Sequence, residues 1–453
     1  MMGTSMKSLN EINEYVRKER HRVNQKYRLK YHLMPPIGWM NDPNGLIYFQ
    51  GQYHLFYQYN PFSSLPGTML WGHATSKDLI HFQEEEAAIL PTEENTSIFS
   101  GGAIEVDHTL CAVYTLHYED DVTRREEVYL TKSKDGYHFS NPICIFDNHT
   151  LPKNISQADF RDPFPVQIND MYYVFVGGKD IELNQGVIVV LKGKMLEQLQ
   201  YAFTIGPFYE LGDMGECPSY HRVDGKDVLL VSGCHVQNRD NDFKNINSSV
   251  FIVGDLDFSQ GKMKVEFIKE MDKGDTFYAP QFINGIEEPI MIGWMEMWGK
   301  EYPTHELKHH WAGAFSIPRR LSIFDQDIYQ NPVDSIEACH KTQKLDSKCL
   351  DIQFDIETHG KLMIVSRNGK VLMGLEEQFY LDTTQANNKN GYIRRTNEAY
   401  KACSVRVLLD VSSIEIFIAD GKEAITSRIY LDGEYQISYD SYVKNIKIKE
   451  VGV

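Results

Sequence analysis

A strand–turn–strand pattern recurs five times between residues 41 and 292, and it limits the possible folds more than any other feature. Each copy has an aliphatic or aromatic run, a two-residue polar turn and a second such run. The second turn residues lie 57, 62, 55 and 60 residues apart; they are Gly51, His108, Asp170, Gly225 and Gly285. A steady period of this length, with several short strands per unit, is typical of a β-propeller rather than a βαβ array. We therefore predict an all-β fold with a five-bladed β-propeller.

Three of the five copies carry an acid just before the first strand run, namely Asp42, Asp162 and Glu216. The other two copies have Ser100-Gly101 and Tyr278-Ala279-Pro280 in this stretch, so the acids are not needed to build a blade. The turn-forming residues around Asp42 predict that its carboxylate sits at the mouth of a hairpin. Three carboxylates converging at one end of a propeller axis indicate acid–base chemistry.

The pattern changes at both ends of the repeats. Residues 9–27 are highly charged, with apolar residues at loosely helical spacing. Residues 405–418 alternate between apolar and polar on either side of a Ser-Ser turn, which predicts a hairpin of a β-sandwich. We predict four segments: an N-terminal helical extension (1–30), a five-bladed propeller that is the catalytic domain (31–330), a linker (331–349) and a C-terminal β-sandwich (350–453).

Composition limits the classes of molecule that the protein is expected to bind. The chain has 46 Lys and Arg against 63 Asp and Glu, a formal net charge of −17, which disfavours nucleic acid and anionic membranes and suits a neutral small molecule such as a sugar. No run of 18 apolar residues exists and the N-terminus lacks an apolar signal core, so we expect a cytoplasmic protein.

A literal H-E-x-x-H match at His305–His309 raises the possibility of a zinc protease, which would need these residues on a helix. Pro303 precedes the match and strand-like runs flank it, so we interpret it as a loop near the last blade and expect no metal and no cofactor.

Several short motifs resemble those of glycoside hydrolase family 32, the β-fructofuranosidases that include invertases and sucrose-6-phosphate hydrolases. The matching stretches are WMNDPNG (39–45), Trp71-Gly72, FSG (99–101), FRDP (160–163), ECP (216–218), YAPQ (278–281), IGWM (292–295) and SSIEIF (412–417). The fold of that family, a five-bladed propeller with a C-terminal sandwich, agrees with the repeats.

The resemblance implies a role for each acid. Asp42 resembles the nucleophile, Glu216 the general acid–base and Asp162 the stabiliser of the transition state. As a general acid, Glu216 is expected to have a raised pKa, and Arg161 is expected to keep Asp162 ionised. The carboxyls of Asp42 and Glu216 should lie about 5 to 5.5 Å apart. The residues that match the fructose subsite are Asn41, Gln58, Trp71, Phe99, Ser100, Arg161, Tyr278 and Trp294.

The implied activity is retaining hydrolysis of terminal β-D-fructofuranosyl units of sucrose, sucrose 6-phosphate or short fructo-oligosaccharides, through a covalent fructosyl-enzyme. A fructosyltransferase on the same scaffold and a non-catalytic fructan-binding propeller are the alternatives. Phe164-Pro165 and Gly215 depart from the family pattern at the leaving-group side, which leaves the leaving group open. We expect a monomer or a homodimer.

Overall fold

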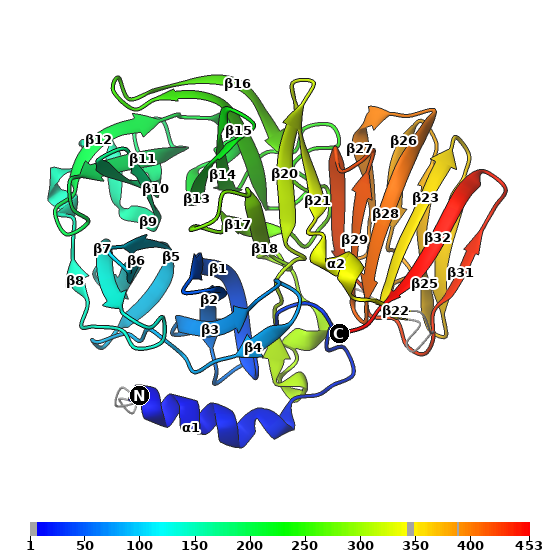
Figure 1. The fold of residues 1–453 in the computed structure, drawn as a ribbon, viewed down its shortest axis with the longest axis horizontal. Helices are drawn as coiled ribbons and strands as arrows, with labels where there is room; N and C mark the ends of the chain where they lie inside the picture. The colour runs from blue at the N-terminus through cyan, green and yellow to red at the C-terminus, as the bar shows by residue number, and fades with distance from the viewer. Residues whose placement is uncertain (1–6, 342–347, 387–388) are drawn as a thin grey trace.

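A computed structural model describes residues 7–341, 348–386 and 389–453. In these residues the strands form seven sheets, five within residues 38–332 and two within residues 340–451. Figure 1 shows the strands of residues 38–332 arranged around a common centre as a β-propeller, with the last two sheets stacked beside it as a sandwich. The mostly-β architecture predicted from the repeats is therefore confirmed.

The propeller strands follow one another in chain order within each sheet, with β19 as the exception. The first sheet holds β1 (Gly38–Phe49), β2 (Gln52–Asn60), β3 (Leu70–Ser76), β4 (Phe82–Glu84) and β19 (Trp311–Ala312); the second β5 (Thr96–Val106), β6 (Thr109–Glu119), β7 (Arg124–Ser133) and β8 (Ile143–Cys144); the third β9 (Ile155–Ile168), β10 (Met171–Asp180), β11 (Gln185–Gly193) and β12 (Gln200–Ile205); the fourth β13 (Met214–Val223), β14 (Lys226–Cys234), β15 (Asn247–Asp257) and β16 (Lys262–Glu270); the fifth β17 (Tyr278–Phe282), β18 (Ile290–Trp294), β20 (Arg319–Phe324) and β21 (Asp327–Pro332).

The ring is closed by a short parallel pairing between its two ends. Strand β19 lies between β18 and β20 in the chain but pairs with β1, with Trp311 opposite Gly38. This contact covers an edge of β1 that would otherwise expose unpaired backbone groups.

The polar turns predicted from the repeats are confirmed as two-residue hairpin turns in the first four sheets. The fifth, Asn284-Gly285, lies instead in a longer loop, because β17 ends at Phe282 and β18 begins only at Ile290. In the first, second and fourth sheets both turn residues have positive φ, as a type I′ turn requires. These pairs are Gln50-Gly51, Asp107-His108 and Asp224-Gly225.

The first strand of each sheet has a register shift at a corresponding place, and this shift is what aims the site residues. The shifts lie between Met40 and Pro43, Ile98 and Gly101, Arg161 and Phe164, Glu216 and Ser219, and Tyr278 and Gln281. A bulge of this kind bends the strand and redirects a side chain. The turn-forming residues around Asp42 therefore produce a bulge inside β1, not the predicted turn before a hairpin, because β1 already begins at Gly38.

The sandwich consists of two antiparallel sheets that bury one apolar core between them. The predicted hairpin around Ser412 is confirmed, since Asp410 pairs with Ser413. One sheet holds β22 (His340–Lys341), β32 (Val443–Val451), β23 (Leu350–Glu357), β28 (Ala402–Asp410), β29 (Ser413–Ile418) and β30 (Glu423–Arg428); the other holds β27 (Ile393–Ala399), β26 (Gln378–Asp382), β25 (Gly369–Leu375), β24 (Lys361–Ser366) and β31 (Gln436–Tyr439).

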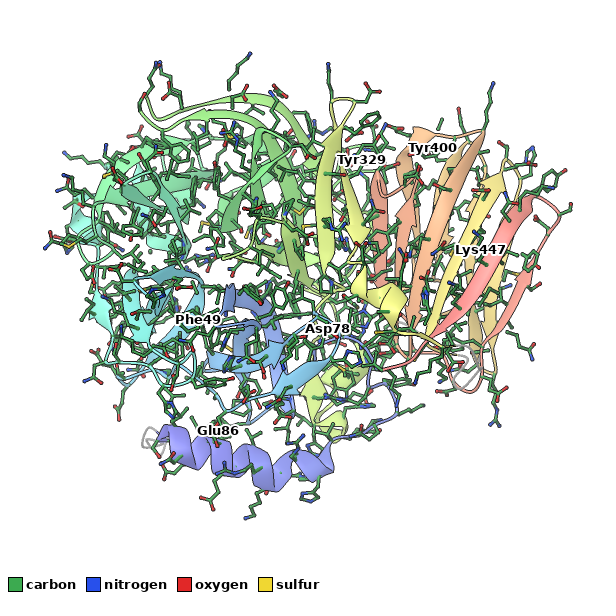
Figure 2. The ribbon with its side chains drawn as sticks, in the orientation of Figure 1. Phe49, Asp78, Glu86, Tyr329, Tyr400 and Lys447 are labelled. Carbon is green, nitrogen blue, oxygen red and sulfur yellow. The ribbon has the colours of Figure 1, made fainter. Side chains whose placement is uncertain are left out.

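Helices are few and lie at the periphery. Helix α1 (Leu9–Glu19) begins with a capping box between Ser8 and Glu11 and buries Ile12 and Val16 against the first sheet. Glu86, labelled at the upper edge of α1 in Figure 2, accepts a hydrogen bond from Asn13 on the helix. The other helical turns are α2 (Ser335–Ala338) and the 3₁₀ turns Arg20–Arg22, Asn148–Thr150, Tyr209–Leu211, Pro303–His305 and Leu307–His309. Among the helices that the structure describes, none has the length and apolar character to cross a membrane.

The H-E-x-x-H match is not on an α-helix. It occupies two successive 3₁₀ turns, and His305 bonds to the buried carboxylate of Glu296 at 2.7 Å. The prediction of an irregular segment there is confirmed.

Candidate active site

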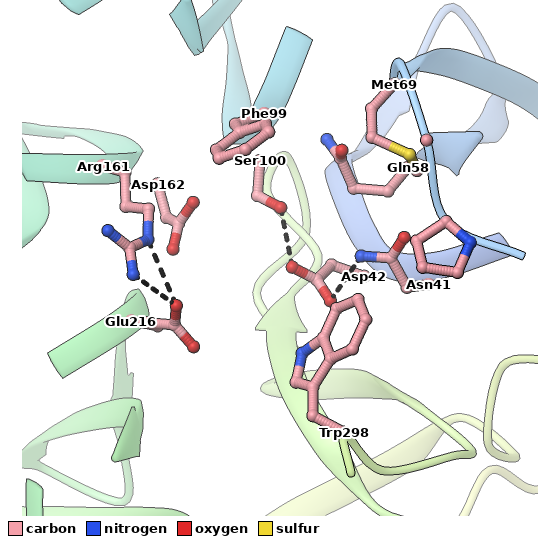
Figure 3. Close-up of a pocket in the computed structure, with 12 residues that line it drawn as sticks. Asn41, Asp42, Gln58, Met69, Phe99, Ser100, Arg161, Asp162, Glu216 and Trp298 are labelled. Atoms are coloured by element: carbon pink, nitrogen blue, oxygen red, sulfur yellow. Dashed lines mark hydrogen bonds and ion pairs between the residues drawn. The ribbon is translucent and has the colours of Figure 1, made fainter. Parts of the chain in front are cut away.

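A cavity of about 230 Å³ opens among the bulged strands of the propeller. Its walls come from β1, β2, β5, β9 and β13 and from two loops, and Figure 3 shows Asp42 on one side facing Arg161, Asp162 and Glu216 on the other. The lining residues are Asn41, Asp42, Gln58, Pro66, Gly67, Met69, Phe99, Ser100, Arg161, Asp162, Glu216 and Trp298. All three acids singled out by the repeats thus border one space.

Three residues predicted for the sugar subsite are not among those that line the cavity. Trp71, Tyr278 and Trp294 are fully buried behind its wall. Trp71 donates from its indole nitrogen to the carbonyl of Phe99 at 3.1 Å, and Trp294 packs against Trp298 with ring centroids 5.0 Å apart. These large aromatic side chains support the residues that face the cavity.

Four lining residues were not predicted: Pro66, Gly67, Met69 and Trp298. The first three belong to the loop between β2 and β3 and its junction with β3, and Trp298 follows β18 by four residues. No residue pattern in that loop indicates a site. Trp298 had a weak signal, because it is an aromatic residue just after the IGWM motif at the end of a predicted strand.

The carboxylate of Asp42 is held by two hydrogen bonds. Ser100 donates to Oδ2 at 2.8 Å and the amide of Asn41 donates to Oδ1 at 3.0 Å. Asn41 is itself fixed by the indole of Trp39, which donates to its side-chain oxygen at 2.8 Å. Burial raises the pKa of Asp42, while these hydrogen bonds act in the opposite direction. Asp42 is therefore oriented from behind, and its exposed face points into the cavity.

Asp162 is the most enclosed of the three acids. Its backbone has a φ of 65°, and its Oδ2 accepts a hydrogen bond from the backbone N–H of Cys217 at 2.9 Å. The thiol of Cys217 lies 3.4 Å from Asp162 and 3.5 Å from Asp42, so it joins the two acids. Burial, together with the charges of Glu216 and Asp42, raises the pKa of Asp162 to about 8 against the opposing effect of Arg161.

Both carboxylate oxygens of Glu216 accept hydrogen bonds. Arg161 donates to Oε1 from Nη2 at 2.7 Å and from Nε at 3.1 Å, and the hydroxyl of Tyr278 donates to Oε2 at 2.5 Å. Burial raises its pKa, but Arg161 and these hydrogen bonds outweigh burial and leave the pKa lowered.

The two expectations about ionisation are therefore wrong. Arg161 was expected to keep Asp162 ionised, yet its guanidinium is directed to Glu216, so the raised pKa belongs to Asp162 and the lowered one to Glu216. The sequence places Arg161 beside Asp162 in the chain, but adjacent residues of a strand point to opposite sides, and a bulge alters that direction further.

Cys217 is not a reactive thiol. Burial and the three surrounding carboxylates raise its pKa well above the ordinary value. It is a small side chain packed between Asp42 and Asp162.

Comparison with known proteins agrees with this arrangement. Residues 32–332 match the glycosyl hydrolases family 32 N-terminal domain and residues 326–451 match the family 32 C-terminal domain. A sucrose-6-phosphate hydrolase from Escherichia coli is 31% identical over 433 residues, which cover 88% of each chain.

Solved structures give the same result. A family 32 β-fructofuranosidase from Bombyx mori, solved as a point mutant in complex with sucrose, has a TM-score of 0.87 and 27% identity over 98% of both chains. A sucrose-6-phosphate hydrolase from Lactobacillus gasseri shares the fold, with a TM-score of 0.88, 24% identity and 99% coverage of both chains. The chain therefore belongs to glycosyl hydrolases family 32 and is a glycoside hydrolase.

Proposed function

We propose that this protein is a retaining β-fructofuranosidase that hydrolyses terminal β-D-fructofuranosyl units. The observation that carries the proposal is that Asp42 and Glu216 border one cavity, with Asp162 connected to the first through Cys217. The names of the relatives, sucrose-6-phosphate hydrolase and raffinose invertase, support the same reaction class.

As its framework we propose that the five sheets are the blades of a five-bladed propeller over residues 31–330. Residues 1–30 are then an N-terminal extension, 331–349 a linker and 350–453 the sandwich domain.

In the first step a carboxylate oxygen of Asp42 attacks the anomeric carbon of the fructosyl unit. The bond to the leaving oxygen breaks as Glu216 gives that oxygen a proton, and a fructosyl ester of Asp42 forms. The hydrogen bonds from Ser100 and Asn41 fix the attacking group before substrate binds.

In the second step Glu216 accepts a proton from water, and the resulting hydroxide displaces Asp42 from the anomeric carbon. Two successive inversions at this carbon return the original anomer. The separation of about 5 to 5.5 Å between the two carboxyls stays a prediction of this mechanism.

The proton that Glu216 delivers is shared among the three acids Asp42, Asp162 and Glu216. With a pKa of about 8 at Asp162, the cluster keeps one proton at neutral pH. Sugar hydroxyls that donate hydrogen bonds to Asp162 favour its ionised form, so substrate binding moves this proton toward Glu216. We accordingly propose that Asp162 accepts hydrogen bonds from the fructose hydroxyls and stabilises the transition state.

The other cavity residues divide between polar contacts and apolar walls. We propose that Asn41, Gln58, Ser100 and Arg161 bind the fructose ring by hydrogen bonds and that Phe99 and Trp298 flank it. Trp71, Tyr278 and Trp294 support this layer from behind.

The test is the Asp42→Ala variant assayed on sucrose, 1-kestose and sucrose 6-phosphate. We expect kcat to fall at least about 10⁴-fold with an unchanged melting temperature, because no other group can form the ester. Asp170→Ala is the matched control, since Asp170 is an exposed acid at the far end of a propeller hairpin. Near-normal turnover by a folded Asp42→Ala protein would exclude this mechanism.

Two measurements on the wild-type enzyme complete the test: the anomer of the first product and the relative kcat/KM on the three substrates. Nuclear magnetic resonance should show β-fructofuranose as the first product, because the mechanism retains configuration. The order of kcat/KM on the three substrates then assigns the leaving group, and longer oligosaccharides formed at high sucrose would identify a fructosyltransferase instead.

A further inference from the structure

A fourth buried carboxylate lies behind the cavity, where the mechanism does not use it. Glu126 on β7 is fully buried and is not among the cavity-lining residues. Its Oε2 accepts hydrogen bonds from the backbone N–H of Phe160 at 2.9 Å and from Nη1 of Arg161 at 3.1 Å. Its Oε1 lies 3.3 Å from the same Nη1 and 3.2 Å from Nδ1 of His117.

Arg161 is therefore shared between two carboxylates. Its Nη1 bonds to Glu126, while Nη2 and Nε bond to Glu216. The planar guanidinium has a fixed fork of donors, so the first contact sets the plane in which the second is made. One positive charge is thus divided between a buried structural acid and the proposed acid–base.

Glu126 carries a permanent negative charge. Burial raises its pKa, but Arg161, His117 and the N–H of Phe160 outweigh burial and lower the pKa to about 2. A charge of this kind does not titrate with the reaction and acts as a constant field on its neighbours.

Resting on the function proposed above, we propose that Glu126 is a positioning residue for Glu216 that acts through Arg161. It holds the guanidinium against Glu216 and takes up part of its positive charge. Arg161 consequently orients Glu216 without fixing it permanently in the ionised form, and Glu216 can receive the proton that the leaving group needs.

Glu126 also supports the opposite wall of the subsite. The ring of His117, which bonds to Glu126, stacks on the ring of Phe99 with centroids 4.1 Å apart and planes 7° apart. The second ring nitrogen of His117 contacts Glu119 at 3.2 Å. One buried carboxylate therefore fixes both a polar and an aromatic residue that line the cavity.

The charged and titratable groups around this network come from several strands. Those that contact Glu126, its partners or Glu216, or that interact with them electrostatically, are Asp42 on β1, His117 and Glu119 on β6, Arg124 on β7, Asp159, Arg161 and Asp162 on β9, Cys217 on β13, Cys234 on β14 and Tyr278 on β17.

The test is the pH profile of kcat/KM for Glu126→Gln. Without the negative charge of Glu126, the positive charge of Arg161 stabilises the ionised form of Glu216 more strongly. The acid cluster then loses its proton at a lower pH. The basic limb of the kcat/KM profile, where activity falls as the pH rises, therefore moves down by about 1 pH unit. At the pH of the wild-type basic limb activity then falls ~10-fold, and it recovers as the pH is lowered. Glu126→Asp, which keeps the charge, should follow the wild-type limb.

The matched control is Glu127→Gln, because Glu127 is adjacent, points to the other face of β7 and pairs with Arg125. A Glu126→Gln protein whose activity is reduced equally at every pH would overturn the proposal, since that is the signature of a packing defect. The proposed function is tested separately, by the activity of Asp42→Ala and by the products of the wild-type enzyme.

A second pair of variants decides the matter if Glu126→Gln does not fold. Arg124 is a largely exposed residue that contacts Glu126 at 3.2 Å and competes with Arg161 for its charge. Arg124→Gln should therefore move the basic limb upward by a few tenths of a pH unit relative to Arg125→Gln, which removes the same charge from the adjacent position. Equal limbs in these two variants would overturn the proposal.

Discussion

Two clusters of buried charge in this molecule contain similar residues and have opposite properties. One is the acid cluster of the cavity, formed by Asp42, Asp162 and Glu216. The other, which we call the junction cluster, joins the propeller to the sandwich and consists of His32, Asp272, Arg319, Asp410 and Glu415. The side chains of the junction cluster are almost completely buried.

In the junction cluster three acids face two cations, and each acid bonds to at least one of them. His32 bonds to Asp410 at 2.8 Å and to Glu415 at 3.0 Å. Arg319 bonds to Glu415 at 2.6 Å and to Asp272 at 2.9 Å. Backbone N–H groups complete the arrangement, and the pKa values of Asp410 and Glu415 are lowered because His32 and Arg319 outweigh the effect of burial.

In the cavity, by contrast, the guanidinium of Arg161 bonds to Glu216 and to Glu126, and Asp162 and Asp42 have no bond to a cation among the described residues. The pKa values of Asp162 and Glu216 therefore move apart, the first upward and the second downward. The comparison teaches that a buried acid is not itself the mark of a catalytic site. Acids that border a cavity and lack a direct bond to a cation are such a mark, whereas a sealed cluster in which every acid bonds to a cation indicates stability.

The largest effect that separates the two clusters should come from Glu216→Gln. We expect kcat on sucrose to fall about 10² to 10⁴-fold, because the leaving oxygen no longer receives a proton. The melting temperature should stay within a few degrees, since the amide oxygen still accepts from Arg161 and the amide nitrogen can donate to the hydroxyl oxygen of Tyr278.

A fructoside with an aryl leaving group provides the control for Glu216→Gln. Such a leaving group departs without full protonation, so the first step should lose much less rate. Equal losses on both substrates would contradict the role of Glu216 as the acid.

Much of the fold could be predicted because the turns and strands of each repeat depend on the residue types at those positions. Turn pairs such as Asp224-Gly225 adopt the positive φ that a tight hairpin needs, and the strands on either side are apolar. The bulges could not be predicted in this way. Pro43 and Gly45 are typical of a turn, and only the neighbouring strand decides that they form a bulge inside β1.

The residues of the candidate site likewise fall into those that local sequence predicts and those that only tertiary contacts reveal. Asp42, Asp162 and Glu216 were found because they occupy corresponding places in repeats, and the structure brings them to one cavity. Glu126 and Trp298 lie outside the repeated motif, so only tertiary contacts identify them. The junction cluster was missed for a similar reason, because His32 and Glu415 are distant in the chain and meet only when the two domains pack.

A change in the junction cluster should affect stability rather than catalysis. Glu415→Gln leaves Arg319 and His32 buried with one counter-charge fewer, and we expect a loss of about 3 to 5 kcal/mol in the free energy of unfolding. Urea unfolding measures this loss, and kcat/KM per folded molecule should not change.

Glu434→Gln is the matched control for Glu415→Gln, because Glu434 is an exposed acid of the same domain. A Glu415→Gln protein that keeps wild-type stability but loses activity would reverse the distinction between the two clusters.

The smallest effect we predict is the pH dependence of stability that His32 confers. Burial alone would lower the pKa of His32, but the hydrogen bonds that its ring donates to Asp410 and Glu415 outweigh burial and raise it. A group whose pKa is raised by folding stabilises the protein fully below its ordinary value of about 6.5, and this contribution disappears as the pH rises through the folded-state pKa. The lowered pKa values of Asp410 and Glu415 act in the other direction, so their contribution disappears only in acid, below their ordinary values.

The junction cluster should therefore contribute most between about pH 5 and pH 6.5. Replacing His32 by Gln should remove the alkaline loss, which amounts to about 1.4 kcal/mol for each unit by which folding raises the pKa of His32. Free energies of unfolding measured at pH 6 and pH 9 for wild type and His32→Gln give this difference directly. If both proteins lost the same stability over that range, His32 would be neutral in the folded protein, and the junction would be held by Arg319 without a second cation.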